Sequence, residues 1–175
     1  MGGGLIQALG AKAMRDFNIL IGRNVIRWVG IEMALSEGSE SVPVIWQHPS
    51  IPYAQFDPLD AFLDDGSAFR FCSQMDDGSD WFGVYSPSHV EKYLSVKPYE
   101  AGSIFRTREV AELPVGSITG VETKTDGSVN VLELFLVIGG SKIRIVSGEV
   151  YETNDGSFKI GFIDESLLVQ VSNGA

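Results

Sequence analysis

Carboxylates are the most concentrated group of side chains in this sequence that could carry out chemistry. Seven of them lie between positions 57 and 80, where Arg70 is the only basic residue: Asp57, Asp60, Asp64, Asp65, Asp76, Asp77 and Asp80. A dense negative field attracts cationic groups and repels the phosphate backbone of nucleic acids. The stretch therefore favours a basic protein partner and disfavours nucleic-acid binding.

Aromatic side chains next to this stretch indicate a recognition surface. Trp46, Tyr53 and Phe56 lie in or beside a segment with three prolines between positions 47 and 58. Aromatic rings anchor protein interfaces, and carboxylates steer the approach of a basic partner. We therefore predict that these three rings and the seven aspartates form a binding surface, whereas Trp81, Phe82 and Tyr85 are expected in the core.

Acidic residues beside glycines could instead bind a metal ion. An EF-hand calcium loop is matched at positions one, five, six and twelve by Glu122, Asp126, Gly127 and Glu133. Lys124 then takes position three, where an oxygen ligand is needed. The flanking residues also alternate as strands do, whereas an EF-hand requires helices. The sequence therefore predicts no metal site and no cofactor.

Support for nucleophilic catalysis is weak. The chain has one thiol, Cys72, and two imidazoles, His48 and His89, and it lacks the G-x-S-x-G and H-E-x-x-H motifs. No catalytic residue is predicted, and a non-catalytic role is favoured. Two alternatives stay open: a small-molecule or enzymatic pocket near Trp46, His48, Tyr53 and Cys72, and a structural subunit of an assembly. Formation of a homo-oligomer also stays open.

Length and composition set the frame for these side chains. The chain has 175 residues, is 44% hydrophobic and carries a net charge of −10, which is typical of one folded domain. We expect a single domain over 1–175 with a flexible start at 1–4. No apolar run reaches the roughly 20 residues that span a bilayer. Together with the single cysteine and the absence of a secretory signal, this predicts a cytoplasmic protein that does not bind membranes.

The sequence Asp-Gly-Ser occurs four times, beginning at positions 65, 77, 126 and 155. Each copy lies beside a run of apolar or β-branched residues, which is the pattern of a β-hairpin. We predict type I′ turns with aspartate and glycine at the two central positions, both with positive φ. The fold is therefore expected to be antiparallel.

Further patterns define the predicted fold class. We expect a mainly β protein, α+β at most, with an antiparallel meander that forms a two-sheet sandwich or an open barrel. Within the meander, which begins at residue 117, Gly148 and Asp164-Glu165 are expected to separate successive strands. In the first part of the chain, Gly30 is expected to mark a bend or a bulge. Further strands are expected at 19–21 and 42–46. An N-terminal helix near 5–13 and a short helix near 88–95 complete the prediction.

The last third contains the segments Ser147-Gly148-Glu149-Val150-Tyr151-Glu152 and Asp164-Glu165-Ser166-Leu167-Leu168-Val169. With these segments, its small size and its acidity, the chain resembles the cytoplasmic immunity proteins of bacterial toxin systems. The resemblance implies a protein that inhibits a cognate toxin by binding it, often with acidic residues that complement a basic nuclease surface.

Overall fold

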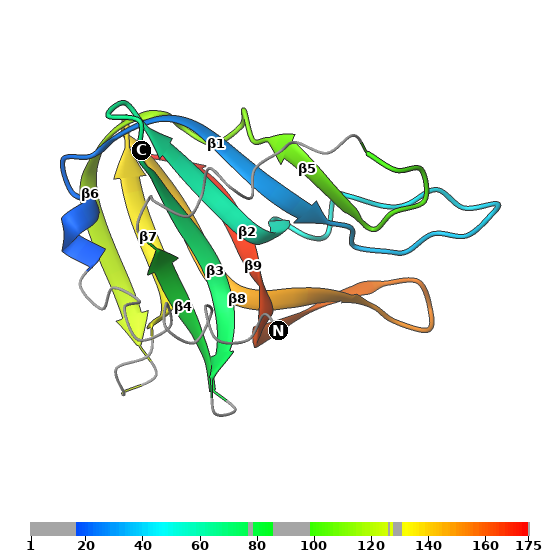
Figure 1. Ribbon diagram of the computed structural model, residues 1–175. Helices are drawn as coiled ribbons and strands as arrows, with labels where there is room; N and C mark the ends of the chain where they lie inside the picture. Colours follow the sequence, from blue (N-terminus) through cyan, green and yellow to red (C-terminus); the bar gives the residue numbers. More distant parts are fainter. Residues whose placement is uncertain (1–16, 77–78, 86–98, 126, 128–130, 175) are drawn as a thin grey trace, which may run out of the picture.

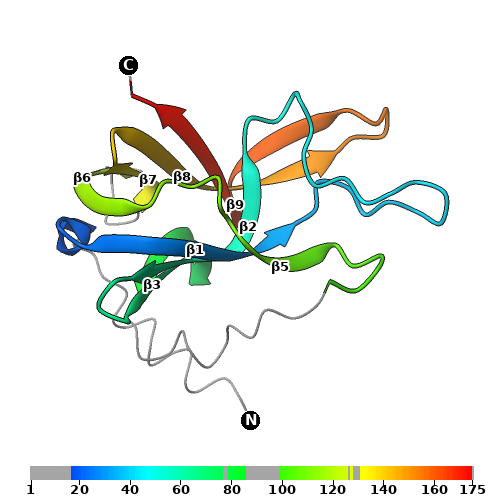
Figure 2. The same cartoon turned by 90° about the horizontal axis from the view of Figure 1, so that it is seen from above.

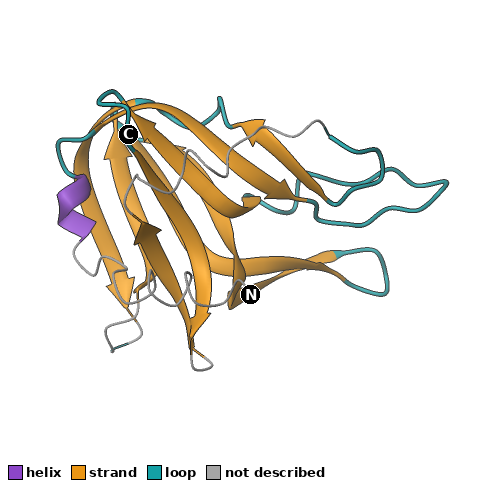
Figure 3. Ribbon diagram, viewed as in Figure 1, coloured by secondary structure: helices purple, strands orange, loops and turns teal. Residues whose placement is uncertain are grey.

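The fold is mainly β, as predicted. The computed structural model describes residues 17–76, 79–85, 99–125, 127 and 131–174, and for 74–76 and 79–85 it describes the backbone alone. Its described part contains nine strands and one short 3-10 helix, η1, at Phe17–Leu20. The strands dominate the molecule in Figure 3.

The strands occupy most of the described chain. They are β1 (Asn24–Met33), β2 (Ala54–Leu63), β3 (Ala68–Asp76), β4 (Ser79–Tyr85), β5 (Phe105–Glu109), β6 (Gly116–Thr125), β7 (Val131–Ile138), β8 (Ser141–Glu152) and β9 (Phe158–Asn173). All pairings between them are antiparallel.

The nine strands belong to one hydrogen-bonded sheet in the order β4-β3-β2-β9-β8-β7-β6-β1-β5. A further pairing joins β2 to β1, so that β1, β2, β9, β8, β7 and β6 form a closed circuit (Figure 1). Of the two arrangements expected, a two-sheet sandwich or an open barrel, the sandwich of two separate sheets is not seen. A single sheet can enclose a core because its strands twist and curve around it.

The core lies inside this circuit and follows from the alternation of apolar residues along the strands. On β7 and β8, Leu134 pairs with Ile145 and Leu136 with Ile143, and all four side chains are fully buried. The lysine and arginine that flank Ile143 point to the opposite face, as predicted, because successive residues of a strand face opposite sides. Trp28 of β1 packs its ring against Phe71 of β3 within the same cluster.

The bulge expected at Gly30 is confirmed. The register of β1 against β2 shifts between Gly30 and Glu32. A Cβ atom added at Gly30 would lie 2.6 Å from the ring of Phe56. Only glycine at position 30 leaves room for the fully buried ring of Phe56. The bulge therefore allows this ring to pack in the core.

All four Asp-Gly-Ser sequences lie between consecutive paired strands, which confirms the hairpins. The predicted turn type is wrong where the turn is described. Gly66 and Gly156 have φ of 82° and 78°, but Asp65 and Asp155 are not in the positive-φ region. These are three-residue loops in which only the last residue is left-handed.

Aspartate has a different role in these loops from the one predicted. Its Oδ1 atom accepts a hydrogen bond from the backbone N–H of the following serine, at 3.0 Å for both Asp65–Ser67 and Asp155–Ser157. Hydrogen bonds from the serine hydroxyls, joined at Asp155 by Thr153, also stabilise the carboxylates. They lower the pKa of Asp65, and that of Asp155 to about 2.

The predicted breaks at Gly148 and Asp164-Glu165 are also wrong, because both lie inside long strands. Ser147 pairs with Leu167, but the next residue, Gly148, pairs with Phe162. Residues 163–166 therefore form a bulge in β9. Beyond it, the outer parts of β8 and β9 form a two-stranded ribbon that projects from the rest of the sheet (Figures 1 and 2).

Three shorter predictions have different outcomes. The strand expected at 19–21 is wrong, because Phe17–Leu20 forms η1. Residues 42–46 form only isolated bridges, Ser36 with Ile45 and Ser39 with Val42. The helices expected near 5–13 and 88–95 lie outside the described residues. The part of the chain that the structure describes contains no helix with the length and apolar character that a membrane crossing requires.

Candidate functional site

The three aromatic residues predicted for a binding surface lie in different environments. Phe56 is fully buried in the core and Tyr53 is 8% exposed, so these two rings are not surface anchors. The hydroxyl of Tyr53 accepts a hydrogen bond from Arg144. Trp46 is half-buried, with the guanidinium of Arg106 4.1 Å from its ring centroid.

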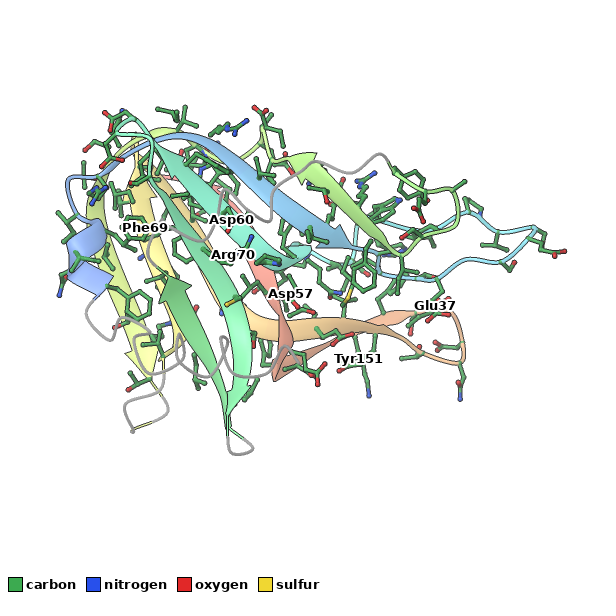
Figure 4. The ribbon with its side chains drawn as sticks, viewed as in Figure 1. Glu37, Asp57, Asp60, Phe69, Arg70 and Tyr151 are labelled. Atoms are coloured by element: carbon green, nitrogen blue, oxygen red, sulfur yellow. The ribbon has the colours of Figure 1, made fainter. Side chains whose placement is uncertain are left out.

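Asp60 is also withdrawn from the predicted surface. Its side chain is fully buried on β2, and Arg70 of β3 donates to both carboxylate oxygens, at 2.8 and 2.9 Å. Figure 4 shows the two side chains next to each other. A charge this deeply buried requires such a partner. Asp60 therefore has a structural role and is not available to a second molecule.

Asp64 and Asp65 are exposed at the turn between β2 and β3, but both have partners within the chain. Arg23 forms an ion pair with Asp65 at 2.6 Å, and Asn24 donates to Asp64 at 3.1 Å. Their negative field is partly neutralised at this end of the molecule. The backbones of Asp76 and Asp80 lie in β3 and β4 without described side chains, and Asp77 lies outside the described residues.

Asp57 differs from these residues because two other acidic side chains, Glu149 and Glu165, are close enough to interact with it. Its side chain is exposed, yet partial desolvation raises its pKa, opposed by the charge of Arg70 and reinforced by Glu165. Glu149 of β8 interacts with the same carboxylates. Desolvation is the main cause of its raised pKa, and repulsion from Asp164, Glu165 and Asp57 raises the pKa further. Carboxylates from β2, β8 and β9 thus repel one another at this place.

Tyr151 connects these acids to the ribbon. Its hydroxyl donates to Asp164, which raises the pKa of the phenol and keeps it protonated. Its ring lies over Gly161 of β9, where an added Cβ atom would be 3.0 Å from the ring. The ring is nevertheless 38% exposed. Tyr151 therefore offers an apolar surface in an acidic environment.

A cleft of about 460 Å³ begins beside Tyr151. It runs between residues 33–38 and residues 149–152, with Ile104 completing its wall. The side chains of Met33, Leu35 and Val150 make part of its lining apolar. Three glutamates, Glu37, Glu149 and Glu152, also line it, and no basic residue does so within the described chain. Figure 4 labels Glu37 and Tyr151, which come from the two segments that line the cleft.

The ribbon wall of the cleft is fixed by a side chain from another strand. Val150 donates its backbone N–H to Oε1 of Gln55 at 2.7 Å. Gln55 is fully buried on β2, and its Nε2 atom has no hydrogen-bond partner among the described residues. Because this bond holds the ribbon against the sheet, the cleft is present before any ligand binds.

The basic residues of β5 are not available to the acids of this cleft. Arg106 and Arg108 both donate to Oε2 of the fully buried Glu32, each at 2.6 Å. Arg108 also donates to Glu112 at 2.6 Å, and its pKa is raised by these carboxylates. The network satisfies its own charges and holds β5 on β1, which indicates a structural role.

A second pocket, of about 520 Å³, corresponds in part to the alternative small-molecule site. His48 and Tyr53 line it, but Trp46 and Cys72 do not. Its remaining lining is largely apolar, with Phe56 and Val169 among the contributors. Nδ1 of His48 is hydrogen-bonded to Ser50 at 2.8 Å.

Among the described residues, no group of three or more histidine, cysteine, aspartate or glutamate side chains is arranged to hold an ion. The chain matches no known protein family, and no curated protein or solved structure is detectably similar to it. The cleft and its three glutamates are therefore the features that bear on function.

Proposed function

We propose that this protein is a non-catalytic binding module that docks a basic protein partner on one acidic face. This acidic face consists of Glu37, Asp57, Glu149, Glu152, Asp164 and Glu165. The observation that carries the proposal is the cleft lined by Glu37, Glu149 and Glu152, with no basic residue among its described lining. Burial and three neighbouring carboxylates raise the pKa of Glu149, which agrees with this arrangement. A bound cation would relieve the repulsion between these carboxylates, which favours a basic partner.

The composition of the cleft suits a lysine or arginine side chain of the partner. Such side chains pack their methylene groups on apolar surface while the charged end reaches a polar group. Here the apolar surface comes from Met33, Leu35 and Val150, and the polar groups from the three lining glutamates. A protruding basic side chain would therefore find both of its requirements in one cleft.

This proposal keeps the predicted basic partner but moves the surface that binds it. The acids between 57 and 80 contribute Asp57, whereas Asp60 and Asp65 are engaged with Arg70 and Arg23. Inhibition of a basic toxin in the cytoplasm, the role implied by the resemblance to immunity proteins, is one form of this function. It requires a docking surface and no chemistry.

The test uses a blocked eight-residue peptide in which arginine alternates with serine. Its affinity is measured by fluorescence anisotropy at low and physiological salt for the wild type and for the triple variant Glu37→Gln, Glu149→Gln, Glu152→Gln. We expect the triple variant to bind at least about tenfold more weakly, with a smaller dependence on salt.

A matched control separates the cleft from the overall charge of the molecule. The variant Asp64→Asn, Asp65→Asn, Glu122→Gln removes three exposed carboxylates outside the ribbon and has the same net charge as the first variant. Asparagine retains an acceptor oxygen for the turn hydrogen bonds. We expect this control to keep most of the affinity. An equal loss in both variants, or no binding to the wild type, would refute the proposal.

A second candidate function is favoured by the 520 Å³ pocket, which is within the size range of small-molecule sites. An apolar ligand bound there would contact His48 and Tyr53. Nuclear magnetic resonance with a library of small aromatic fragments tests it: chemical-shift changes centred on Val169 and Ile51 would support the pocket, and their absence across the library would exclude it for ligands of this class.

A further inference from the structure

Two exposed apolar side chains lie at the bulge where the ribbon leaves the sheet. Phe162 and Ile163, which we call the apolar knuckle, are each 52% exposed. They precede Asp164 and Glu165 directly, so they have carboxylates of the acidic face as chain neighbours. Exposed apolar side chains rimmed by charged groups are a common feature of protein interfaces.

The backbone of the knuckle is strained. Ile163 has a φ of 63° and is the one residue other than glycine with positive φ in the described part of the chain. A β-branched residue is disfavoured in this region because its side chain crowds the backbone. Half of the side chain is exposed, so burial does not fully compensate. Strain kept at an exposed position directs attention to function.

The knuckle and the cleft are parts of one continuous surface. Tyr151 lines the cleft, and its hydroxyl donates to Asp164, the residue after Ile163. On the other face of the ribbon, Val150 lines the cleft and pairs with Ile160, which is two residues before Phe162 and therefore on the same face of β9. A segment bound in the cleft could therefore reach Phe162 along the face of Val150, with Ile163 and Asp164 next to it in the chain.

We infer that the apolar knuckle is the hydrophobic half of the docking surface, and that the partner presents a segment in which basic and apolar residues alternate or adjoin. The inference rests on the proposed function and specifies the partner's chemistry. A second copy of this chain is a poor occupant, because its net charge of −10 opposes an acidic face. The occupant is a cationic segment with aliphatic side chains.

Two blocked peptides of equal charge test this inference. In one, four arginines alternate with serines, and in the other, four arginines alternate with leucines. We expect the leucine peptide to bind the wild type about tenfold more tightly, the effect of a moderate interface anchor. The variant Phe162→Ser, Ile163→Gly should abolish this preference and leave the affinity for the serine peptide unchanged.

A control variant removes similar exposed side chains elsewhere. Ile19→Ser with Ile21→Ser changes two residues that are 42% and 47% exposed at the other end of the molecule, and it should keep the leucine preference. Circular dichroism and thermal unfolding establish that each variant is folded. The glycine at position 163 also relieves the positive-φ strain, so loss of the fold is not expected to explain loss of the preference.

The outcomes separate the two proposals. Equal affinity of the two peptides for the wild type, or a preference that survives in the knuckle variant or disappears in the control, overturns the inference and leaves the basic-partner function intact. Failure of both peptides to bind overturns the function and the inference together. A preference lost in the knuckle variant alone supports both.

Discussion

Asp60 of β2 and Arg70 of β3 are direct cross-strand partners, and two parallel hydrogen bonds join their side chains. The carboxylate is fully buried, whereas 21% of the arginine side chain is exposed. Burial raises the pKa of Asp60 above its usual 3.8, and the hydrogen bonds and charge of Arg70 act in the opposite direction. The pair adds a side-chain connection to the backbone pairing of β2 and β3, and this connection requires both partners.

Arg70→Met should therefore destabilise the fold by about 3 kcal/mol at pH 7, because it leaves a buried carboxylate without its partner. Asp60 has a raised pKa in the folded state, and losing Arg70 raises it further. Protonation then favours the folded state, so the variant should recover stability as the pH falls toward 4. Urea unfolding at pH 7 and pH 5 measures both effects. Adding Asp60→Asn should restore part of the loss at pH 7, and a double variant no more stable than Arg70→Met would contradict this account.

Glu149→Gln should raise the melting temperature at pH 7 by about 1–2 °C, the size expected of a partly exposed charge. The pKa of Glu149 is raised above 4.5 in the folded state. The contribution of Glu149 to the free energy of unfolding is therefore complete below pH 4.5, where the side chain is protonated. It is lost as the pH rises through the raised pKa. Calorimetry between pH 4 and 7 should show a gain for the variant only at the upper end. Glu122→Gln, which removes an ion pair with Lys142, should give no gain.

Ile163→Gly should be more stable than Ile163→Ala by about 1 kcal/mol, because alanine keeps the Cβ atom that is disfavoured at positive φ. In an extended strand the order is the reverse, since glycine loses more conformational freedom on folding. Chemical unfolding of the two variants measures the difference. The matched pair Ile160→Gly and Ile160→Ala, also on β9, should show the ordinary order. An alanine variant at 163 as stable as the glycine variant would mean that the bulge does not hold this conformation in solution.

Gln55→Met should destabilise the protein by about 1–3 kcal/mol, because the backbone N–H of Val150 loses its acceptor. Hydrogen exchange at Val150 should accelerate strongly, while exchange at Leu134 in the main core should change only as far as global stability requires. Undiminished protection of Val150 would show that another group holds the ribbon. The arginine–serine peptide should also bind this variant more weakly, because one wall of the cleft is then less ordered.

Much of the fold could be predicted from local sequence, because hairpins and face alternation are local properties. The Asp-Gly-Ser turns and the apolar faces of β7 and β8 are examples. The role of Gly148 was not predictable in this way, since a glycine can end a strand or permit a bulge. Its outcome depends on the distant contact of a Cβ position with Leu168, at 2.8 Å.

The site was harder to predict because its members are far apart in sequence. Asp60 and Asp65 belong to a dense run of aspartates in the sequence and were therefore predicted to bind a partner. In the structure each forms an ion pair with an arginine that the sheet brings near it. Glu37, Glu149 and Glu152 were not predicted as site residues, although they line one cleft. The acidic segments at 149–152 and 164–165 were a visible signal, but only the bulge in β9 places them next to Asp57.

The circuit of strands is not equally strong along its length. Between β6 and β1 the paired register covers only Asn24 with Ser117 and Val25 with Gly116, supplemented by backbone hydrogen bonds from Gly22 and Ile118. The β8–β9 pairing, by contrast, extends over twelve residue pairs. The molecule therefore has a seam, and thermal fluctuations should part it there first, separating the amino-terminal strand from the carboxy-terminal meander while the ribbon with its acidic face stays assembled.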